Sequence, residues 1–149
     1  PVDRANRVGG DHVGFARERR RLQALGHAGL HEPGLDADDA QAAQAARAVA
    51  SSQLVQCSLN GEDPYWGRVL SELGASGASI DQERVTISYG GHVVCEQGIE
   101  AAHDADAVRA VMAAREIVIH ADLGLGQGEA EVLFTDLSYA YIDENRGTS

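Results

Sequence analysis

Residues 61–68 read Gly-Glu-Asp-Pro-Tyr-Trp-Gly-Arg and contain the only tryptophan of the chain. They follow a short apolar run that predicts a strand, and they precede a pattern that predicts a helix. Asp63 is suited to cap this helix, and Pro64 suits its first position, where no amide hydrogen is required. The apolar side chains that follow recur at helical spacing and predict one buried face, formed by Trp66, Val69, Leu70 and Leu73. We therefore predict a strand-to-helix junction here.

The composition is that of a globular domain whose core consists mainly of aliphatic side chains. The 149 residues are 44% hydrophobic but only 5% aromatic, and their formal net charge is -11. This charge argues against nucleic acid or an anionic membrane as a partner, since both favour a basic protein face. No signal peptide pattern and no apolar run of roughly 20 residues is present, so we expect a cytoplasmic protein. We expect Cys57 and Cys95 to be buried free thiols.

The chain divides into two unlike parts near residue 35. Residues 1–35 are rich in Arg, Gly and His and show no clear apolar period, so we expect loop, frayed helix or disorder there. The arginines between positions 17 and 21 are expected to lie on a solvated helix face. The abrupt loss of pattern also supports the hypothesis of a reading-frame shift or false start upstream of Asp36. Residues 36–149 are predicted to form one domain.

Within residues 36–149, local patterns predict alternating helices and strands. The predicted helices are at 37–50, from Asp63 to Gly74, which closes the helix in a left-handed conformation, and at about 104–112. The predicted strands are at 54–59, 85–89, 92–96, 116–122, 129–135 and 139–142. Gly90 and Gly91 join the strands at 85–89 and 92–96, and a glycine-rich turn pairs the strands at 116–122 and 129–135. Helices mixed with hairpins favour a mixed α/β (α+β) fold, in which mixed or antiparallel sheets and helices form a layered sandwich.

Three polar constellations have a structural interpretation that outweighs the chemical one. Gly124–Gly128 lacks the spacing of a phosphate-binding loop and no helix follows it, so a hairpin turn is favoured. His120 and Asp122 share one face of a strand, but no third ligand matches them, so no metal site is predicted. Ser58, Ser138 and the scattered histidines form no recognisable arrangement of nucleophile and base.

Two segments keep a functional interpretation beside the structural one. Turn, cap and aromatic anchor explain residues 61–68, yet Glu62, Asp63 and Arg68 also place charge around the tryptophan. A charged turn at a helix N-terminus can bind a carboxylate or orient a partner loop. The polar tail 145–149 is expected to be frayed, but a tail that folds back offers an amide and hydroxyls that suit an amino-acid substrate.

Four motifs occur in order along residues 36–149. They are Ala48–Val55 leading into Gly61–Leu70, the strand Asp81–Tyr89, Asp122–Gly126 before an apolar strand, and Thr135–Tyr139 followed by Tyr141 and Asn145. In this order they resemble the C-terminal part of the β chain of the bifunctional ornithine acetyltransferase / N-acetylglutamate synthase (glutamate N-acetyltransferase) family of arginine biosynthesis. The specific part is the turn Asp-Pro-(any)-Trp-Gly-Arg combined with the ending Asp-Leu-Ser-Tyr. The family usually has Asn where this chain has Tyr65.

The resemblance implies acetyl transfer from N-acetylornithine to glutamate, and acetyl-coenzyme A serves some members as a further substrate. It implies no other cofactor. The family's precursor cuts itself before a threonine, which becomes the nucleophile, and the two resulting chains stay together. A threonine hydroxyl with its own amine as base, facing an oxyanion hole, suits this chemistry. The implied partner is the α chain of the same precursor in an α2β2 hetero-oligomer, and the implied fold is a layered α/β sandwich.

The resemblance assigns substrate-binding residues but no catalytic ones. Nothing in the chain matches the nucleophilic threonine with its Ala-Thr junction, or the Gly-Glu-Gly-(small)-Thr-Lys loop of the family. The chain alone is therefore expected to be inactive. The substrate-binding candidates are Asn145 and Ser149, with Thr148 as the alternative hydroxyl because the tail is one residue shorter than the commoner pattern. The turn adds candidate supports of the active site: Asp63, Trp66 and Arg68.

A second interpretation is a non-catalytic α/β interaction or scaffold module that kept the family's framework and lost its chemistry. Its support is the missing catalytic loop and the unrelated N-terminal segment. The isolated fragment is expected to expose apolar surface that the missing part of the family's polypeptide normally covers, and therefore to aggregate or bind apolar dyes.

Overall fold

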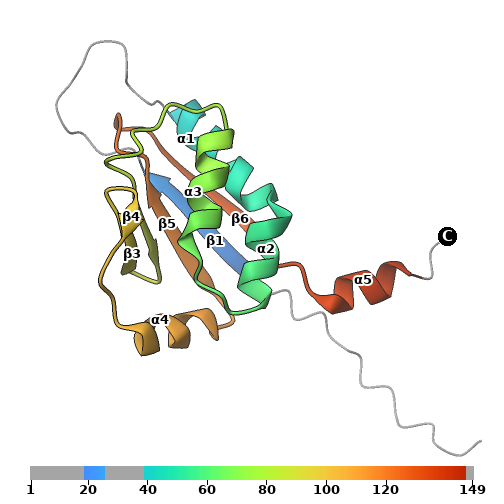
Figure 1. The fold of residues 1–149 in the computed structure, drawn as a ribbon. Helices are drawn as coiled ribbons and strands as arrows, with labels where there is room; N and C mark the ends of the chain where they lie inside the picture. The colour runs from blue at the N-terminus through green and yellow to red at the C-terminus, as the bar shows by residue number, and fades with distance from the viewer. Residues whose placement is uncertain (1–18, 26–38, 147–149) are drawn as a thin grey trace, which may run out of the picture.

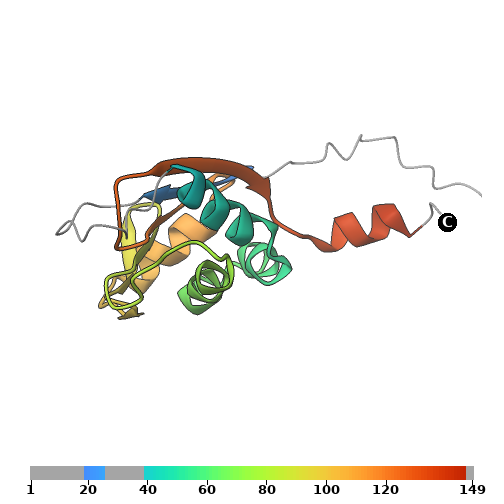
Figure 2. The same ribbon diagram turned by 90° about the horizontal axis from the view of Figure 1, so that it is seen from above.

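The computed structural model describes residues 19–25 and 39–146, in which one sheet carries helices on one face (Figures 1 and 2). The strands are β1 (Arg19–Leu25), β2 (Thr86–Tyr89), β3 (His92–Glu96), β4 (Ile99–Glu100), β5 (Ile117–Asp122) and β6 (Glu129–Thr135). The helices are α1 (Asp39–Ser51), α2 (Gln53–Asn60), α3 (Trp66–Ala75), α4 (Ala105–Met112) and α5 (Tyr139–Asn145). The predicted mixed α/β layered fold is confirmed. None of these described helices has the length and apolarity needed to cross a membrane.

The strand order is β4-β3-β2-β5-β1-β6, so the sheet is mixed, with one parallel pair among antiparallel ones. We predicted that 116–122 and 129–135 pair as a hairpin, and this prediction is wrong, because β1 lies between β5 and β6. The connecting loop must therefore span two strand spacings, about 10 Å, which six residues do easily. Its amide at Gly124 donates to Asp122 Oδ1 at 2.9 Å, which turns the chain without pairing the strands.

The predicted loop, frayed helix or disorder at 1–35 is wrong for Arg19–Leu25, which form an inner strand of the sheet. The arginines at 19–21 thus belong to a strand and not to a helix face; residues 1–18 and 26–35 lie outside the described residues. β1 runs parallel to β5, with Leu22 opposite Ile119, and antiparallel to β6, with Leu22 opposite Val132. Both partners lie about a hundred residues away in sequence, so no local period reveals this strand. The domain division at residue 35 and the reading-frame hypothesis stay predictions.

The core lies between the sheet and the helices on its covered face (Figure 2). α1 packs over β1 and β6 and against α3, and its small side chains let its backbone approach the sheet closely. The strand predicted at 116–122 is confirmed as β5, in which alternate residues are fully buried. The largest buried core members are Tyr89, Leu59, Leu73, Ile87, Met112, Ile117, Ile119 and Leu123.

The segment predicted as a strand at 54–59 is the helix α2, so that prediction is wrong. Ser52 caps this helix by accepting from the amide of Val55 at 3.4 Å. Val55 and Leu59 are buried one helical turn apart, whereas Leu54 is exposed. The four-residue spacing of the buried side chains, which packs the helix against the core, overrides the strand propensity of the run.

The helix that follows confirms the predicted buried face. Val69 and Leu73 are buried, while Trp66 and Leu70 are half-buried against the core. Its predicted ends are wrong. Tyr65 occupies the N-cap position without a side-chain cap hydrogen bond, so Asp63 does not cap the helix. At the other end α3 continues past Gly74 to Ala75, and the left-handed conformation, with a φ of 79°, occurs at Gly77.

The hairpin and the helix after it agree with the sequence. Gly90 and Gly91 join β2 to β3 with φ values of 55° and 87°, which suit the tight turn predicted there. Asp104 caps α4 by accepting from the amides of Asp106 and Ala107 at 3.0 and 3.1 Å. The hydrogen bonds from Ala107 and then Asp106 lower the pKa of the Asp104 carboxyl below its ordinary value.

Candidate functional site

The turn between α2 and α3 gathers three of its side chains into one charged and aromatic group. Arg68 Nη1 lies 3.5 Å from Asp63 Oδ2, and the Arg68 guanidinium carbon lies 5.7 Å from the centre of the Tyr65 ring. The Tyr65 ring also packs on Gly67, where a Cβ atom would lie 2.9 Å from its Cζ. The ion pair, the cation–π contact and the ring packing thus connect Asp63, Tyr65, Gly67 and Arg68 within the predicted functional turn.

A buried tyrosine lies in the electrostatic field of this turn. Tyr89 at the end of β2 is fully buried, and its hydroxyl has no hydrogen-bond partner among the described residues. Burial raises the pKa of the Tyr89 hydroxyl, the Asp63 carboxylate raises it further, and the Arg68 guanidinium opposes them. A buried hydroxyl without a partner costs free energy. Tyr89 is therefore a polar group of the site that the sequence did not indicate.

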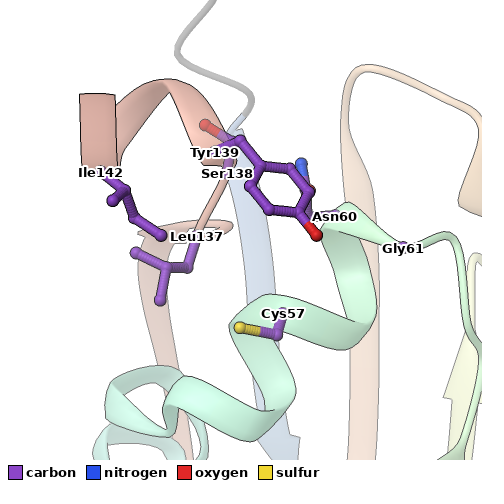
Figure 3. A pocket seen from close by; sticks show the side chains of 7 residues that line it. All are labelled: Cys57, Asn60, Gly61, Leu137, Ser138, Tyr139 and Ile142. Carbon is purple, nitrogen blue, oxygen red and sulfur yellow. The ribbon is translucent and has the colours of Figure 1, made fainter. Parts of the chain in front are cut away.

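A second feature is a pocket between α2 and the segment that leads into α5 (Figure 3). Its volume is about 250 Å³, and its lining residues are Cys57, Asn60, Gly61, Leu137, Ser138, Tyr139 and Ile142. Two hydrogen bonds hold the segment against α2. The Leu137 amide donates to the Gln56 carbonyl at 3.4 Å, and Asn60 Nδ2 donates to Asp136 Oδ2 at 3.3 Å.

The segment predicted as a last strand at 139–142 is the helix α5, so that prediction is wrong. The short-range contacts of this segment are helical: Asn145 Nδ2 donates to the Tyr141 carbonyl at 2.7 Å, and Arg146 Nη1 lies 3.7 Å from Asp143 Oδ1. The segment has no place beside a strand, and none of its side chains is buried. Local hydrogen bonds thus decide its conformation.

The predicted site residues occupy two separate places. Asp63, Trp66 and Arg68 lie at the start of α3, whereas Asn145 ends α5, and in both views α2 lies between α3 and α5 (Figures 1 and 2). The structure brings Asp63 and Arg68 together but does not bring Asn145 to them. Thr148 and Ser149 lie outside the described residues. The chain thus presents two candidate surfaces and no single closed site among its described residues.

The two cysteines differ in their environment. Both are free thiols; Cys95 is buried, as predicted, whereas Cys57 is exposed, which corrects the prediction for that residue. The correction follows from the helix at 53–60, in which Val55 and Leu59 face the core and Cys57 faces the pocket. Burial raises the pKa of the Cys95 thiol, and a hydrogen bond from the Gly98 backbone opposes this shift. Reading the run at a period of 3.6 residues would have shown Cys57 to be outside.

No cluster of three or more His, Cys, Asp and Glu side chains that could hold a metal ion occurs in the described part of the chain. His120 and Asp122, which alternate with the buried Ala121 in β5, are both half-buried. Both take part in other interactions.

The fold is an α/β domain, and comparison with known proteins places it in a family of arginine biosynthesis. It belongs to the ArgJ family, whose model matches residues 35–147. This confirms the resemblance that its motifs carry.

Two curated proteins and one solved structure that are similar to the chain belong to the same family. The chain is 40% identical over 107 residues to the arginine biosynthesis bifunctional protein ArgJ of Mycobacterium tuberculosis, which covers 70% of this chain and 25% of that protein. It is 39% identical over 110 residues to the ArgJ of Ruegeria pomeroyi, covering 73% and 27%. The crystal structure of the ArgJ of Bacillus halodurans superposes with a TM-score of 0.78 at 26% identity, covering 89% of this chain and 59% of that one. The chain thus spans about a quarter of the length of the named relatives.

Proposed function

We propose that this chain supplies the C-terminal part of a glutamate N-acetyltransferase, an enzyme that moves acetyl from N-acetylornithine to glutamate. Membership of the ArgJ family is the observation that carries the proposal. The turn at residues 61–68 and the ending at residues 135–145 support it, since both lie within the residues 35–147 that the family model matches. In some members acetyl-coenzyme A is a second acetyl donor, and we include it as a substrate, with no other cofactor.

The chemistry requires a threonine nucleophile of the family's kind, and the 149 residues contain no Ala-Thr junction to supply it. None of the three threonines of this chain follows an alanine, because Thr86 follows Val, Thr135 follows Phe and Thr148 follows Gly. In the proposed reaction a threonine Oγ of the partner attacks the acetyl carbonyl, and ornithine leaves with the proton on its amine. The amine of glutamate then attacks the threonine ester and regenerates the hydroxyl. The partner is the α chain together with the threonine-bearing part of the β chain, in an α2β2 assembly.

This chain contributes binding groups and a framework in that scheme. The Asn145 amide and the hydroxyl of Ser149 or Thr148 bind the amino-acid substrate, while Asp63, Trp66 and Arg68 hold the turn that supports the site. The alternative, a non-catalytic interaction module, keeps the same framework and predicts binding without acetyl transfer. Alone, the chain is inactive under both interpretations.

A growth experiment separates the two interpretations. A bacterial strain that requires arginine because it lacks this acetyltransferase receives two genes. One encodes this chain, and the other encodes the ArgJ of M. tuberculosis without the segment that aligns with it. We expect growth without arginine only when both genes are present. Formation of the complex without growth, while the intact relative restores growth, contradicts the enzymatic proposal and favours the module.

A further inference from the structure

The helix α5 is set apart from the rest of the described domain. In both views it projects from the body beyond α2, and no other described helix or strand covers it (Figures 1 and 2). None of its side chains is buried, although three of them are large and apolar: Tyr139 is 83%, Tyr141 55% and Ile142 49% exposed. Aromatic side chains exposed in this way contribute strongly when a partner desolvates them.

We call the helix α5 the arm. Its apolar surface continues onto the rest of the domain where α5 begins, next to α2. Figure 3 shows Leu137 and Ile142 directed toward one another, with the Cys57 thiol of α2 directed into the same space. The pocket among them has a volume of about 250 Å³. A single large apolar side chain of a partner fits this volume. Arm and pocket thus form one contiguous apolar surface.

The charges around this surface select the occupant. Asp136 lies at the base of the arm, and Asp143 and Glu144 lie on it, against a single Arg146 that pairs with Asp143. The formal net charge of the chain is -11, so electrostatics disfavour a second copy of the chain as the occupant. A partner surface with an apolar groove and a basic rim is complementary.

We propose that α5 is a docking arm that seats Tyr139, Tyr141 and Ile142 in a basic-rimmed apolar groove of the rest of an ArgJ-type polypeptide. This inference rests on the proposed function. The relatives carry about three quarters of their length beyond what this chain spans, and this remainder supplies the groove. Docking places Asn145, which ends the arm, on the partner, and this explains why the described residues form no closed site.

The test uses the full chain, co-expressed with the ArgJ of M. tuberculosis from which the aligned segment is deleted. The double variant Tyr139→Ala/Ile142→Ala is compared with the original chain and with Leu133→Ala and Ile99→Ala, which remove other exposed apolar side chains, from β6 and β4. We expect co-purification to fall at least tenfold for the double variant and less than twofold for the controls. The variant's thermal unfolding should be unchanged, because α5 buries no side chain in the domain.

A second readout uses the exposed thiol at the base of the arm. The partner should slow the labelling of Cys57 by a maleimide at least fivefold, and Asp143→Asn/Glu144→Gln should weaken binding and reduce its salt dependence. Equal co-purification of all variants, or no co-purification at all, overturns the proposal. The proposal is also overturned if the chain alone forms a dimer that Tyr139→Ala dissociates, because the partner of α5 is then a second copy of the chain. Binding that depends on the arm but gives no acetyl exchange leaves the arm in place and contradicts the enzymatic function.

Discussion

Arg68 Nη1 lies 3.5 Å from Asp63 Oδ2 across the start of α3, and the pair stands where a helix cap was expected. Both side chains are partly exposed, so solvent screens their attraction. The pair therefore orients the turn more than it stabilises the fold.

Asp63→Asn should lower the free energy of unfolding by less than about 1 kcal/mol. Trp66→Ala, in contrast, removes a half-buried anchor of the core and should cost about 3 kcal/mol. Urea denaturation of both variants checks this ranking. A loss for Asp63→Asn as large as that for Trp66→Ala would show that the ion pair, and not the indole, secures the turn.

Tyr89→Phe should leave the free energy of unfolding unchanged or raise it by about 1 kcal/mol, because the hydroxyl that it removes is buried without a partner among the described residues. The variant should also respond differently to alkali. The pKa of Tyr89 in the folded chain is raised above its ordinary value of 10.0. The unfolded chain therefore loses this proton first, so the free energy of unfolding is unaffected by Tyr89 ionisation below pH 10.0 and falls as the pH rises above 10.0.

Urea titrations between pH 8 and 11 should show a smaller alkaline loss for the Phe variant than for the original chain. A destabilisation of more than about 1 kcal/mol at neutral pH would show that the hydroxyl has a partner after all.

Gly90→Ala and Gly91→Ala form a matched pair in the β2–β3 turn. Both residues have positive φ, so each substitution strains the backbone, by about 1 kcal/mol. A Cβ at Gly90 would also lie 2.7 Å from Cγ1 of Val111, whereas nothing lies within 4 Å of one at Gly91. Gly90→Ala should therefore be the more destabilising, and adding Val111→Ala should reduce the difference. Thermal unfolding measures both effects, and equal losses would exclude the steric contact as their source.

The two thiols should react at different rates. Cys57 is exposed beside the pocket, whereas Cys95 is buried with a raised pKa, so a thiol reagent should modify Cys57 at least tenfold faster in the folded chain. In urea both should react alike. Cys57→Ser should leave one slow phase, and Cys95→Ser one fast phase. Two thiols of equal rate in the folded chain would contradict the placement of α2.

Local sequence rules predicted the parts of the fold that local forces decide. The Gly90-Gly91 turn, the helix at about 104–112 and the strand at 116–122 depend on neighbours in sequence, and all three were predicted. Tertiary contacts decided the rest. β1 is a strand because β5 and β6 bond to both of its edges, and α2 is a helix because Val55 and Leu59 pack against the core together.

The candidate site was predicted in part for the same reason. Asp63 and Arg68 are five residues apart at a turn, so their proximity follows from the sequence. Tyr89 reaches the field of that turn only through the packing of the sheet under α3, which no spacing reveals. The two tyrosines and the isoleucine of α5 suggested a strand, but the segment pairs with no described strand and its contacts are local and helical.

Transfer of labelled acetyl from N-acetylornithine to glutamate tests the central claim most directly. The complex of this chain with the truncated ArgJ of M. tuberculosis is purified, and acetylglutamate is measured against the chain alone, the truncated protein alone and the intact relative. We predict that acetylglutamate forms only in the complex and the intact relative, and that Asn145→Ala in the complex lowers the rate at least tenfold while Asn60→Ala has a smaller effect. A purified complex that forms no acetylglutamate, beside an active intact relative, would contradict the assignment of this chain to acetyl transfer.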